Sequence, residues 1–256
     1  MQSTESELRM SHGAIRACLR KCAAQPELFA TMGMVNPAGQ NAGTRCAFEL
    51  PHVGTIVVQE PTPPPSTGWR VSPASLALAD WACQPHMVAR HWAKGASVLE
   101  VGAGLGVPGV ALARLGASVT LTEHAPVLVA ALEALARAET ARAAATETAA
   151  AAGEGGEKDE SHGGEEELKL AFGSLCAAQL DAGAAGLEQW RAAWPAAERA
   201  DWVVAVEFLY EEKHARMLAG VALALCKMNF VTICAVRTGS YHKVRFCCEF
   251  LLLMLR

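Results

Sequence analysis

The sequence lacks the features that would send the chain to a membrane, into the secretory pathway or onto nucleic acid. Its polar start has no apolar core of a signal peptide. The longest apolar run, residues 246–255, is interrupted by Glu249 and is shorter than the roughly 20 residues that span a bilayer. The formal net charge is −4, so we expect no basic face for phosphate contacts. From these absences we expect a protein of the cytoplasm or nucleus with no nucleic acid and no membrane partner. We also expect the chain to be a monomer.

Patterns for disulfides and metals are missing as well. The 9 cysteines include no CxxC pair and no zinc-ligand spacing, so we expect buried reduced thiols and no metal site. What the sequence does have is apolar material, 52% of its 256 residues. That is enough for the core of one α/β domain.

Short apolar strands alternate with helices from residue 97 onward. We expect strands at residues 97–101, 118–123, 168–172, 201–208 and 230–236. Helices are expected at residues 107–115, 125–150, 211–225 and 241–255, with a helix-rich connection at 174–200. Repeated β–α–β units indicate a parallel sheet. The sequence therefore predicts an α/β fold, a Rossmann-like, doubly wound, mostly parallel sheet with helices on both faces.

Two elements are expected before this unit. Residues 46–60 hold two β-prone runs around Pro51 and Gly54, which predicts a hairpin. Residues 72–83 predict a helix with Ser72 as its N-cap, followed by proline at the first helical position.

The domain boundaries follow from these elements and from composition. Residues 1–45 are interpreted as an N-terminal extension and residues 46–256 as the folded domain. The acidic, glycine-rich stretch 153–167 has almost no apolar side chains to bury, so it is predicted to be a disordered insert.

The most informative segment is VLEVGAGLGVPG, residues 98–109. A strand runs into Gly102-Ala-Gly-Leu-Gly106 and then into a helix. Glycines allow a sharp turn and a close ligand, and a helix N-terminus suits an anionic group. A nucleotide-like ligand is therefore expected. Gly104-x-Gly106-x-x-Gly109 also has the spacing of the dinucleotide fingerprint.

Two features argue against a dinucleotide. Counted from the first glycine, Gly102, the third-glycine position is Val107. Glu100 lies inside the strand, where it would repel a pyrophosphate and needs a cation or several donors. S-adenosyl-L-methionine, with its ammonium and sulfonium groups, supplies that cation. Glu123 ends the second strand, at the separation where an acid binds ribose hydroxyls in either cofactor class. The alternative is a purely structural turn, with Glu100 at a surface strand end and Glu123 at a helix start.

The whole segment VLEVGAGLGVPGVALARLGASVTLTE resembles the cofactor-binding segment of class I (seven-β-strand) S-adenosylmethionine-dependent methyltransferases. Within them it is similar to the methyltransferase-like family 16, a protein-lysine methyltransferase group. TGWRVSPASLALADW resembles the helix that precedes this segment in the family, and the hairpin lies where the family has one. DWVVAVEFLYEEKHARML resembles the stretch that carries its D-x-x-Y motif. The resemblance covers about residues 45–250.

The resemblance implies roles for residues around the turn. Gly102, Ala103 and Gly104 would line the methionine part of the cofactor. Glu100 would face its amino group, directly or through water. Glu123, where the family usually has Asp, would hold the ribose hydroxyls.

It also implies roles further along the chain. Val206 would lie beside the cofactor, and Ser174, at the expected exit of the third strand, is a candidate for the adenine. Glu207 and Tyr210 fall on the D-x-x-Y positions near the acceptor channel and are the expected catalytic residues.

Four departures from the family pattern stand out. Glu replaces Asp at position 207, Ser72 occupies a position where the family often has Trp, and the third-strand exit lacks its Trp-Gly pair. The chain also stops after the helix that follows the fifth strand, so the C-terminal strands that complete the family's sheet are expected to be missing. That would leave the fifth strand as an exposed edge.

The expected function is an S-adenosyl-L-methionine-dependent methyltransferase that acts on a lysine of a protein substrate. Three alternatives stay open. The acceptor could be a small molecule or another protein group, since this fold hosts many acceptors. The chain could be an NAD-dependent oxidoreductase. It could also be a catalytically inactive binding or scaffold protein, which the missing strands and Ser72 favour.

Overall fold

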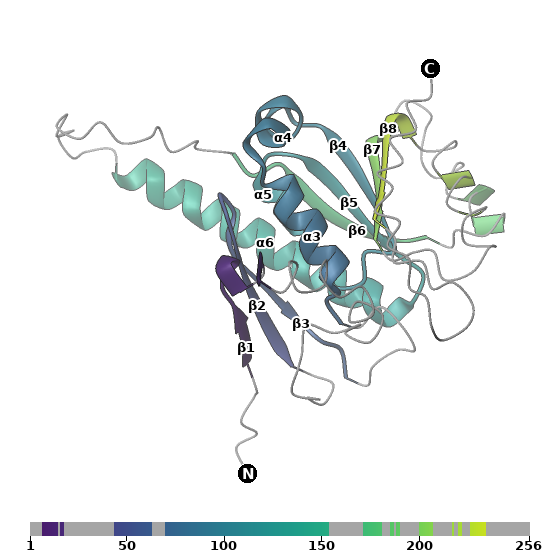
Figure 1. The fold of residues 1–256 in the computed structure, drawn as a ribbon, viewed down its shortest axis with the longest axis horizontal. Helices are drawn as coiled ribbons and strands as arrows, with labels where there is room; N and C mark the ends of the chain where they lie inside the picture. The colour runs from purple at the N-terminus through teal and green to yellow at the C-terminus, as the bar shows by residue number, and fades with distance from the viewer. Residues whose placement is uncertain are drawn as a thin grey trace, which may run out of the picture.

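The computed structural model describes part of the chain (Figure 1). The described residues are 7–14, 16–17, 44–62, 70–153, 171–180, 185–186, 188–189, 200–206, 217, 220–221 and 226–233. The strands are β1 (Glu7–Met10), β2 (Arg45–Leu50), β3 (Gly54–Gln59), β4 (Ser97–Val101), β5 (Ser118–Glu123), β6 (Ser174–Gln179), β7 (Ala200–Val206) and β8 (Cys226–Ile233). The helices are α3 (Pro73–Ala82), α4 (Pro85–Arg90), the 3-10 turn η1 (Trp92–Lys94), α5 (Val107–Arg114) and α6 (Pro126–Gly153).

Five parallel strands form the main sheet in the order β6-β5-β4-β7-β8. The chain moves outward from β4 through β5 to β6, and then returns to the other side of β4 for β7 and β8. This reversal beside β4 makes a topological switch point between β4 and β7. The predicted Rossmann-like, doubly wound sheet is confirmed.

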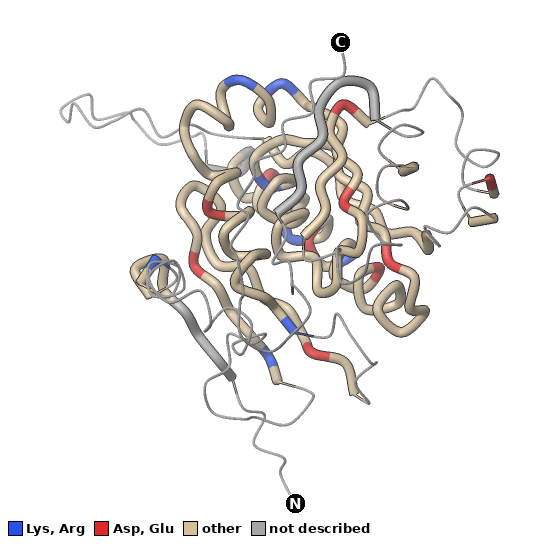
Figure 2. The backbone as a smooth tube through the Cα atoms, turned by 45° about the vertical axis from the view of Figure 1, so that its right-hand side comes forward, with Lys and Arg blue, Asp and Glu red and all other residues tan. Residues whose placement is uncertain are grey.

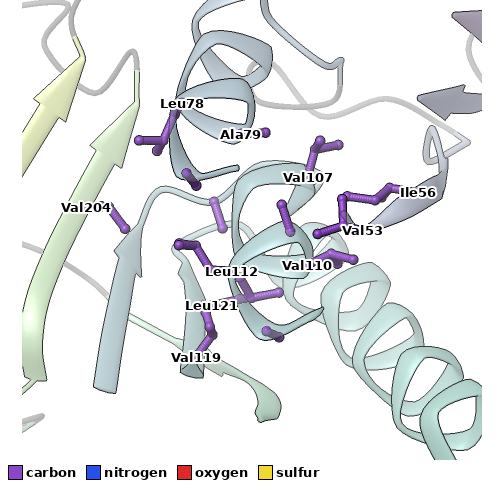
Figure 3. Packing of buried hydrophobic residues seen from close by; sticks show 14 of the residues in the cluster. Val53, Ile56, Leu78, Ala79, Val107, Val110, Leu112, Val119, Leu121 and Val204 are labelled. Atoms are coloured by element: carbon purple, nitrogen blue, oxygen red, sulfur yellow. The ribbon is translucent and has the colours of Figure 1, made fainter. Parts of the chain in front are cut away.

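The described helices α3, α5 and α6 cover one face of this sheet (Figure 1). Close packing of α5 on β5 brings Leu112 against Val119 and Leu121, while Val204 of β7 completes the layer beside α3 (Figure 3). All four side chains are almost fully buried. The segments predicted to cover the opposite face lie outside the described residues.

A second, smaller sheet packs against the outer side of α5. It has the order β1-β2-β3, with β2 and β3 as the predicted hairpin. Val53 and Ile56 point from this hairpin toward Val107 and Val110 of α5 (Figure 3). Strand β1 was not predicted. It comes from the N-terminal extension and pairs in parallel with β2, so the extension contributes an element to the fold.

The hairpin is fastened to α5 and α6 through Arg114. Its Nε and Nη2 donate to the two carboxylate oxygens of Glu139 at 2.8 and 2.6 Å. Its Nη1 donates to the carbonyl oxygens of Val53 and Thr55 at 2.8 and 2.7 Å. Burial alone would raise the pKa of Glu139, but the hydrogen bonds and charge of Arg114, together with Arg142, hold it below its ordinary value of 4.5.

Most predicted elements around the turn are confirmed, including the helix that Ser72 caps. The Ser72 side chain accepts a hydrogen bond from the backbone N–H of Ser75 at 3.0 Å. The predicted bounds of the third strand, 168–172, are wrong at Ala171 and Phe172, which lie in no strand, while residues 168–170 lie outside the described residues. The third strand of the sheet, β6, starts at Ser174 and pairs with β5 from Ser118 onward.

Several predictions fall on residues that the structure does not describe. These are the acidic insert beyond Gly153, most of the helix at 211–225 and the final helix at 241–255. The fifth strand is confirmed but begins earlier than predicted, at Cys226.

In the part of the chain that the structure describes, Lys and Arg positions are distributed over several separate elements rather than along one stripe (Figure 2). No helix among these residues is both long enough and apolar enough to cross a bilayer. These residues also include no group of three or more His, Cys, Asp or Glu side chains that could hold a metal ion.

Candidate cofactor site

The candidate site lies at the carboxyl ends of β4, β5 and β7. Pairing in register brings Val101 at the end of β4 next to Thr122 of β5 on one side and Ala205 of β7 on the other. In open parallel sheets, ligands bind outside the carboxyl ends of the strands at the switch point. The glycine turn that follows β4 therefore occupies the place where this topology holds a ligand.

Three left-handed glycines shape this turn. Gly102, Gly104 and Gly106 have φ values of 67°, 55° and 72°, a region that other residues rarely adopt. At Gly106 a Cβ atom would lie 2.8 Å from Leu132 Cδ2 and 3.1 Å from Leu121 Cδ1. Glycine is therefore required there both for backbone conformation and for packing against α6 and β5.

The turn is tied to the neighbouring strand. The Ala103 N–H donates to the carbonyl oxygen of Thr122 at 2.9 Å, and the Gly104 N–H donates to Glu123 Oε2 at 3.2 Å. Ala103 and Gly104 are buried, whereas Gly102 is half-buried. The three residues predicted to line the methionine part of a cofactor thus form one continuous backbone edge.

Glu123 lies where the sequence predicts it, at the end of β5, with its carboxylate 5% exposed. Oε2 accepts the Gly104 N–H, while Oε1 accepts the His124 backbone N–H at 2.8 Å and contacts His124 Nδ1 at 2.6 Å. Each carboxylate oxygen has two lone pairs. Glu123 therefore retains acceptor capacity for a hydroxyl group while holding the turn in place.

Glu100 is buried within the sheet. It is 1% exposed, its Oε2 has no hydrogen-bond partner, and the Gly109 N–H of α5 faces its carboxyl group. Burial raises the pKa of Glu100 to about 8; the Gly109 amide opposes this and the nearby charge of Glu123 adds to it. The structure thus places this acid beneath the first turn of α5.

The N-terminus of α5 has fewer donors for an anion than the sequence suggests. Pro108 has no N–H, the Gly109 N–H faces Glu100, and the Gly106 N–H donates to the carbonyl oxygen of Ala103 at 2.8 Å. A pyrophosphate at a helix N-terminus relies on such amides. This end of the helix is therefore poorly equipped for a dinucleotide.

The glycine-spacing argument against a dinucleotide does not hold. A Cβ at Gly109 would lie 2.2 Å from Leu121 Cδ2 and 2.6 Å from Glu100 Oε2. Gly109 thus allows α5 to lie directly on the sheet, which is the task of the third glycine in the fingerprint. The shortage of α5 amides, not the glycine offset, distinguishes this turn from a pyrophosphate cradle.

Two further predicted site residues have different outcomes. Val206, 8% exposed, ends β7 at the same edge as the turn. Ser174 does not belong to the site. It is the first residue of β6 and pairs with Ser118 at the start of β5, so it lies at the amino edge of the sheet. The error follows from placing the third strand too early.

The predicted catalytic residues Glu207 and Tyr210 lie outside the described residues. Val206 immediately precedes Glu207, so the chain leaves β7 at the candidate site.

One residue that the sequence reasoning missed is Gln179. It ends β6 in register with Glu123, and its Nε2 donates to the carbonyl oxygen of His124 at 3.3 Å. The Leu180 N–H donates to the carbonyl oxygen of Glu123 at 3.0 Å. Correct placement of the third strand would have brought both residues to this edge.

The residues present fit a nucleoside cofactor with a small amino acid arm. The left-handed glycines place the backbone of the turn at the carboxyl ends of the strands, and the Glu123 carboxylate retains acceptor capacity for a hydroxyl group. The orphaned Oε2 of Glu100 marks a buried acid with no positive partner among the described residues. The arrangement can bind and orient such a ligand at the switch point.

Comparison with known proteins supports the interpretation of the glycine turn as part of a cofactor site. Residues 54–151 match the model of a family described as lysine methyltransferase. The match spans the hairpin strand β3, the helix α3, the glycine turn and most of α6. The resemblance to class I methyltransferases, which use S-adenosyl-L-methionine as methyl donor, is therefore confirmed over this segment. No curated protein matches the sequence.

Solved structures with similar folds include three methyltransferases. The T. thermophilus 16S rRNA methyltransferase RsmC, in complex with AdoMet and guanosine, has 17% identity and a TM-score of 0.49 over 77% of this chain and 42% of that chain. An S-adenosylmethionine-dependent methyltransferase from Neisseria gonorrhoeae has 16% identity and a TM-score of 0.39 over 89% and 83%. The glycopeptide N-methyltransferase MtfA has 17% identity and a TM-score of 0.31 over 54% and 46%. The chain spans 42% of the length of RsmC and about half of that of MtfA.

Proposed function

We propose, for a chain whose residues 54–151 match the lysine methyltransferase family, that the protein transfers the methyl group of S-adenosyl-L-methionine to a lysine side chain of a protein substrate. The observation that carries the proposal is the pairing of a left-handed glycine turn with the Glu123 carboxylate through the Gly104 N–H. This paired turn and carboxylate lie at the switch point of the sheet, and both belong to the residues that match the family model.

The described residues would hold the cofactor as follows. The backbone edge from Gly102 to Gly104 would face the methionine part, and Glu123 would accept hydrogen bonds from the ribose hydroxyls. Val206 would lie beside the cofactor at the end of β7. For Glu100 the sequence predicts contact with the ammonium group, directly or through water, whereas its position beneath α5 favours an indirect role through that helix.

When bound, the sulfonium group supplies a methyl group that is transferred in line to a nucleophile, with a neutral thioether as leaving group. The protein's own task is therefore mainly positioning and electrostatic stabilisation. An acceptor amine must lose its proton before it can attack, since a free lysine has a pKa of about 10.4.

Glu207 and Tyr210 are proposed for the acceptor side. A carboxylate at Glu207 would attract the incoming ammonium group, and Tyr210 would hydrogen-bond the amine or wall the channel. A dry, partly aromatic channel favours the neutral amine. Both residues follow the end of β7 in the chain, which is the support for this assignment.

Two measurements test the proposal. Thermal unfolding with S-adenosylhomocysteine should show stabilisation that NADH does not give, because a ligand that binds only the folded state raises its stability. Glu123→Ala should weaken that binding by about tenfold or more, since a hydrogen bond to a charged group contributes roughly 1.5–3 kcal/mol. Glu49→Ala, which removes an exposed acid from β2, is the matched control and should bind normally.

Transfer of a labelled methyl group into cell lysate then separates the acceptors. Counts in protein lysine support the proposal, and Glu207→Ala should abolish them. Counts in small molecules would support another acceptor class. Binding without transfer would indicate a scaffold, and stabilisation by NADH instead of S-adenosylhomocysteine would refute the proposed cofactor.

A further inference from the structure

Glu100 faces an apolar layer, although it lies only two residues before the turn. In the parallel register its neighbours are Leu121 of β5 and Val204 of β7, and residues paired in this way project from the same face of a sheet. Both neighbours are fully buried. The carboxyl group therefore belongs to the layer that α5 covers.

Helix α5 lies directly on this carboxyl group. A Cβ at Gly109 would be 2.6 Å from Glu100 Oε2, so only a glycine lets the helix approach so closely. The Gly109 N–H faces the carboxyl group. On the strand side, Thr122 Oγ1 donates to the backbone carbonyl oxygen of Glu100 at 2.7 Å. Glu100 thus fills the space between β4 and the first turn of α5.

No described positive charge balances this acid. The charged side chain of α5 is Arg114, which bonds Glu139 and the hairpin instead. On β5 the neighbouring titratable group is Glu123, a like charge. In the described part of β7 the charged group is Asp201, which accepts hydrogen bonds from Ser97 at the opposite end of the strands. An ionised Glu100 would be an unpaired buried charge, which is costly.

We propose that Glu100 is a neutral brace, a protonated carboxyl group that sets the position of the first turn of α5. It acts on the cofactor site through this helix and the glycine turn, and makes no direct contact with a positively charged group of the ligand. It is thus a positioning residue, and the effect on the cofactor rests on the proposed function. Burial, which raises the pKa of Glu100 to about 8, is consistent with the proton remaining at neutral pH.

The first test measures S-adenosylhomocysteine binding by calorimetry at pH 7 for the wild type, Glu100→Gln and Glu100→Ala. Glutamine keeps the volume and the acceptor without the charge, so Glu100→Gln should retain the affinity within about threefold. Glu100→Ala leaves a cavity beneath α5 and should lose about tenfold or more. Glu123→Gln is the matched control for loss of a carboxylate that touches the ligand. The brace is refuted if Glu100→Gln loses about tenfold in affinity while its melting temperature stays at the wild-type value.

The second test uses the ligand-free protein and does not depend on the proposed function. An acid whose folded pKa is raised from 4.5 to about 8 contributes stability that is complete below pH 4.5 and is lost as the pH rises toward 8. Glu100→Gln has no such proton to lose. The melting temperature of Glu100→Gln should therefore rise relative to that of the wild type as the pH increases from 5 to 9. A difference that does not change with pH would overturn the brace. If the wild type binds no S-adenosylhomocysteine, the proposed function fails, and this comparison still decides the state of Glu100.

Discussion

Replacing Arg114 by Ala should destabilise the protein, because it removes the hydrogen bonds that connect the β2–β3 hairpin to helices α5 and α6. Arg114 is 8% exposed and Glu139 is 6% exposed, and four hydrogen bonds of 2.6–2.8 Å leave the guanidinium. Removing one partner of a buried ion pair costs about 3–5 kcal/mol, because the other charge stays buried. Arg142 Nε remains 3.0 Å from Glu139 Oε2, which favours the lower end, about 3 kcal/mol.

Thermal unfolding at pH 7 measures this loss, which corresponds to a fall in melting temperature of roughly 10 °C for a chain of this size. Arg142→Ala is the matched control, since its side chain is 44% exposed and a pair of that kind contributes about 0.5 kcal/mol or less. The double replacement of Arg114 and Glu139 by Met should recover most of the stability, because it leaves no buried charge.

The stability that the Arg114–Glu139 pair contributes should decrease at acid pH. Because the folded pKa of Glu139 is held below 4.5, the pair contributes stability above pH 4.5 and loses it as the pH falls through the lowered value. The difference in the free energy of unfolding between the wild type and Arg114→Ala should therefore become smaller as the pH is lowered. A loss below about 1 kcal/mol at pH 7, or one equal to that of Arg142→Ala, would refute the reasoning.

Three smaller perturbations follow from the same packing. Gly109→Ala, normally stabilising in a helix by about 1 kcal/mol, should instead destabilise by about 1–3 kcal/mol in denaturant unfolding, because its Cβ would lie 2.2 Å from Leu121 Cδ2; a gain would show that α5 can lift freely. Ser72→Ala should cost about 1 kcal/mol in the same assay through loss of the α3 cap, and an unchanged midpoint would mean that the cap is dispensable. Trp92→Phe removes an indole that is fully buried and donates to the carbonyl oxygen of Ala82 at 3.0 Å. It should lower the melting temperature by at least a few degrees, since an orphaned buried acceptor costs about 1–3 kcal/mol.

The segment from β4 to β5 could be predicted from sequence because its determinants are local. A short apolar run, three glycines in the left-handed region and a proline at the second position of α5 each restrict the backbone over a few residues. These rules fixed the bounds of β4 and β5 to the residue. They could not show which way Glu100 packs or what lies above it, since that depends on how closely α5 approaches.

The third strand shows where local reasoning fails. The apolar stretch at 168–172 looks more like a strand than SLCAAQ, whose small residues give little β preference. The structure nevertheless uses Ser174–Gln179, which pairs with β5 along its whole length. The backbone enters this strand through Gly173, whose N–H donates to the carbonyl oxygen of Ala113 at 2.9 Å. These partners are distant in sequence, so no window of the chain reveals them.

The same applies to β1, whose four residues ELRM are half charged and include no β-branched or aromatic side chain. In the structure it pairs with β2 along its whole length. The N-terminal region is further held by Asp80 of α3, which bonds His12 at 2.8 Å and Arg16 at 3.3 Å. Contacts of this kind depend on where two distant segments end up in space, and composition does not encode them.

Strand β1 has a practical consequence for anyone who shortens the protein. The boundary at residue 45 inferred from composition runs between two strands that pair with each other, Glu7–Met10 and Arg45–Leu50. Cutting there would bare the backbone donors and acceptors along one side of a largely buried, apolar strand. A second copy of the protein could then supply the lost neighbour by edge-to-edge pairing. Strand β1 thus covers the edge of β2 at which such pairing would take place.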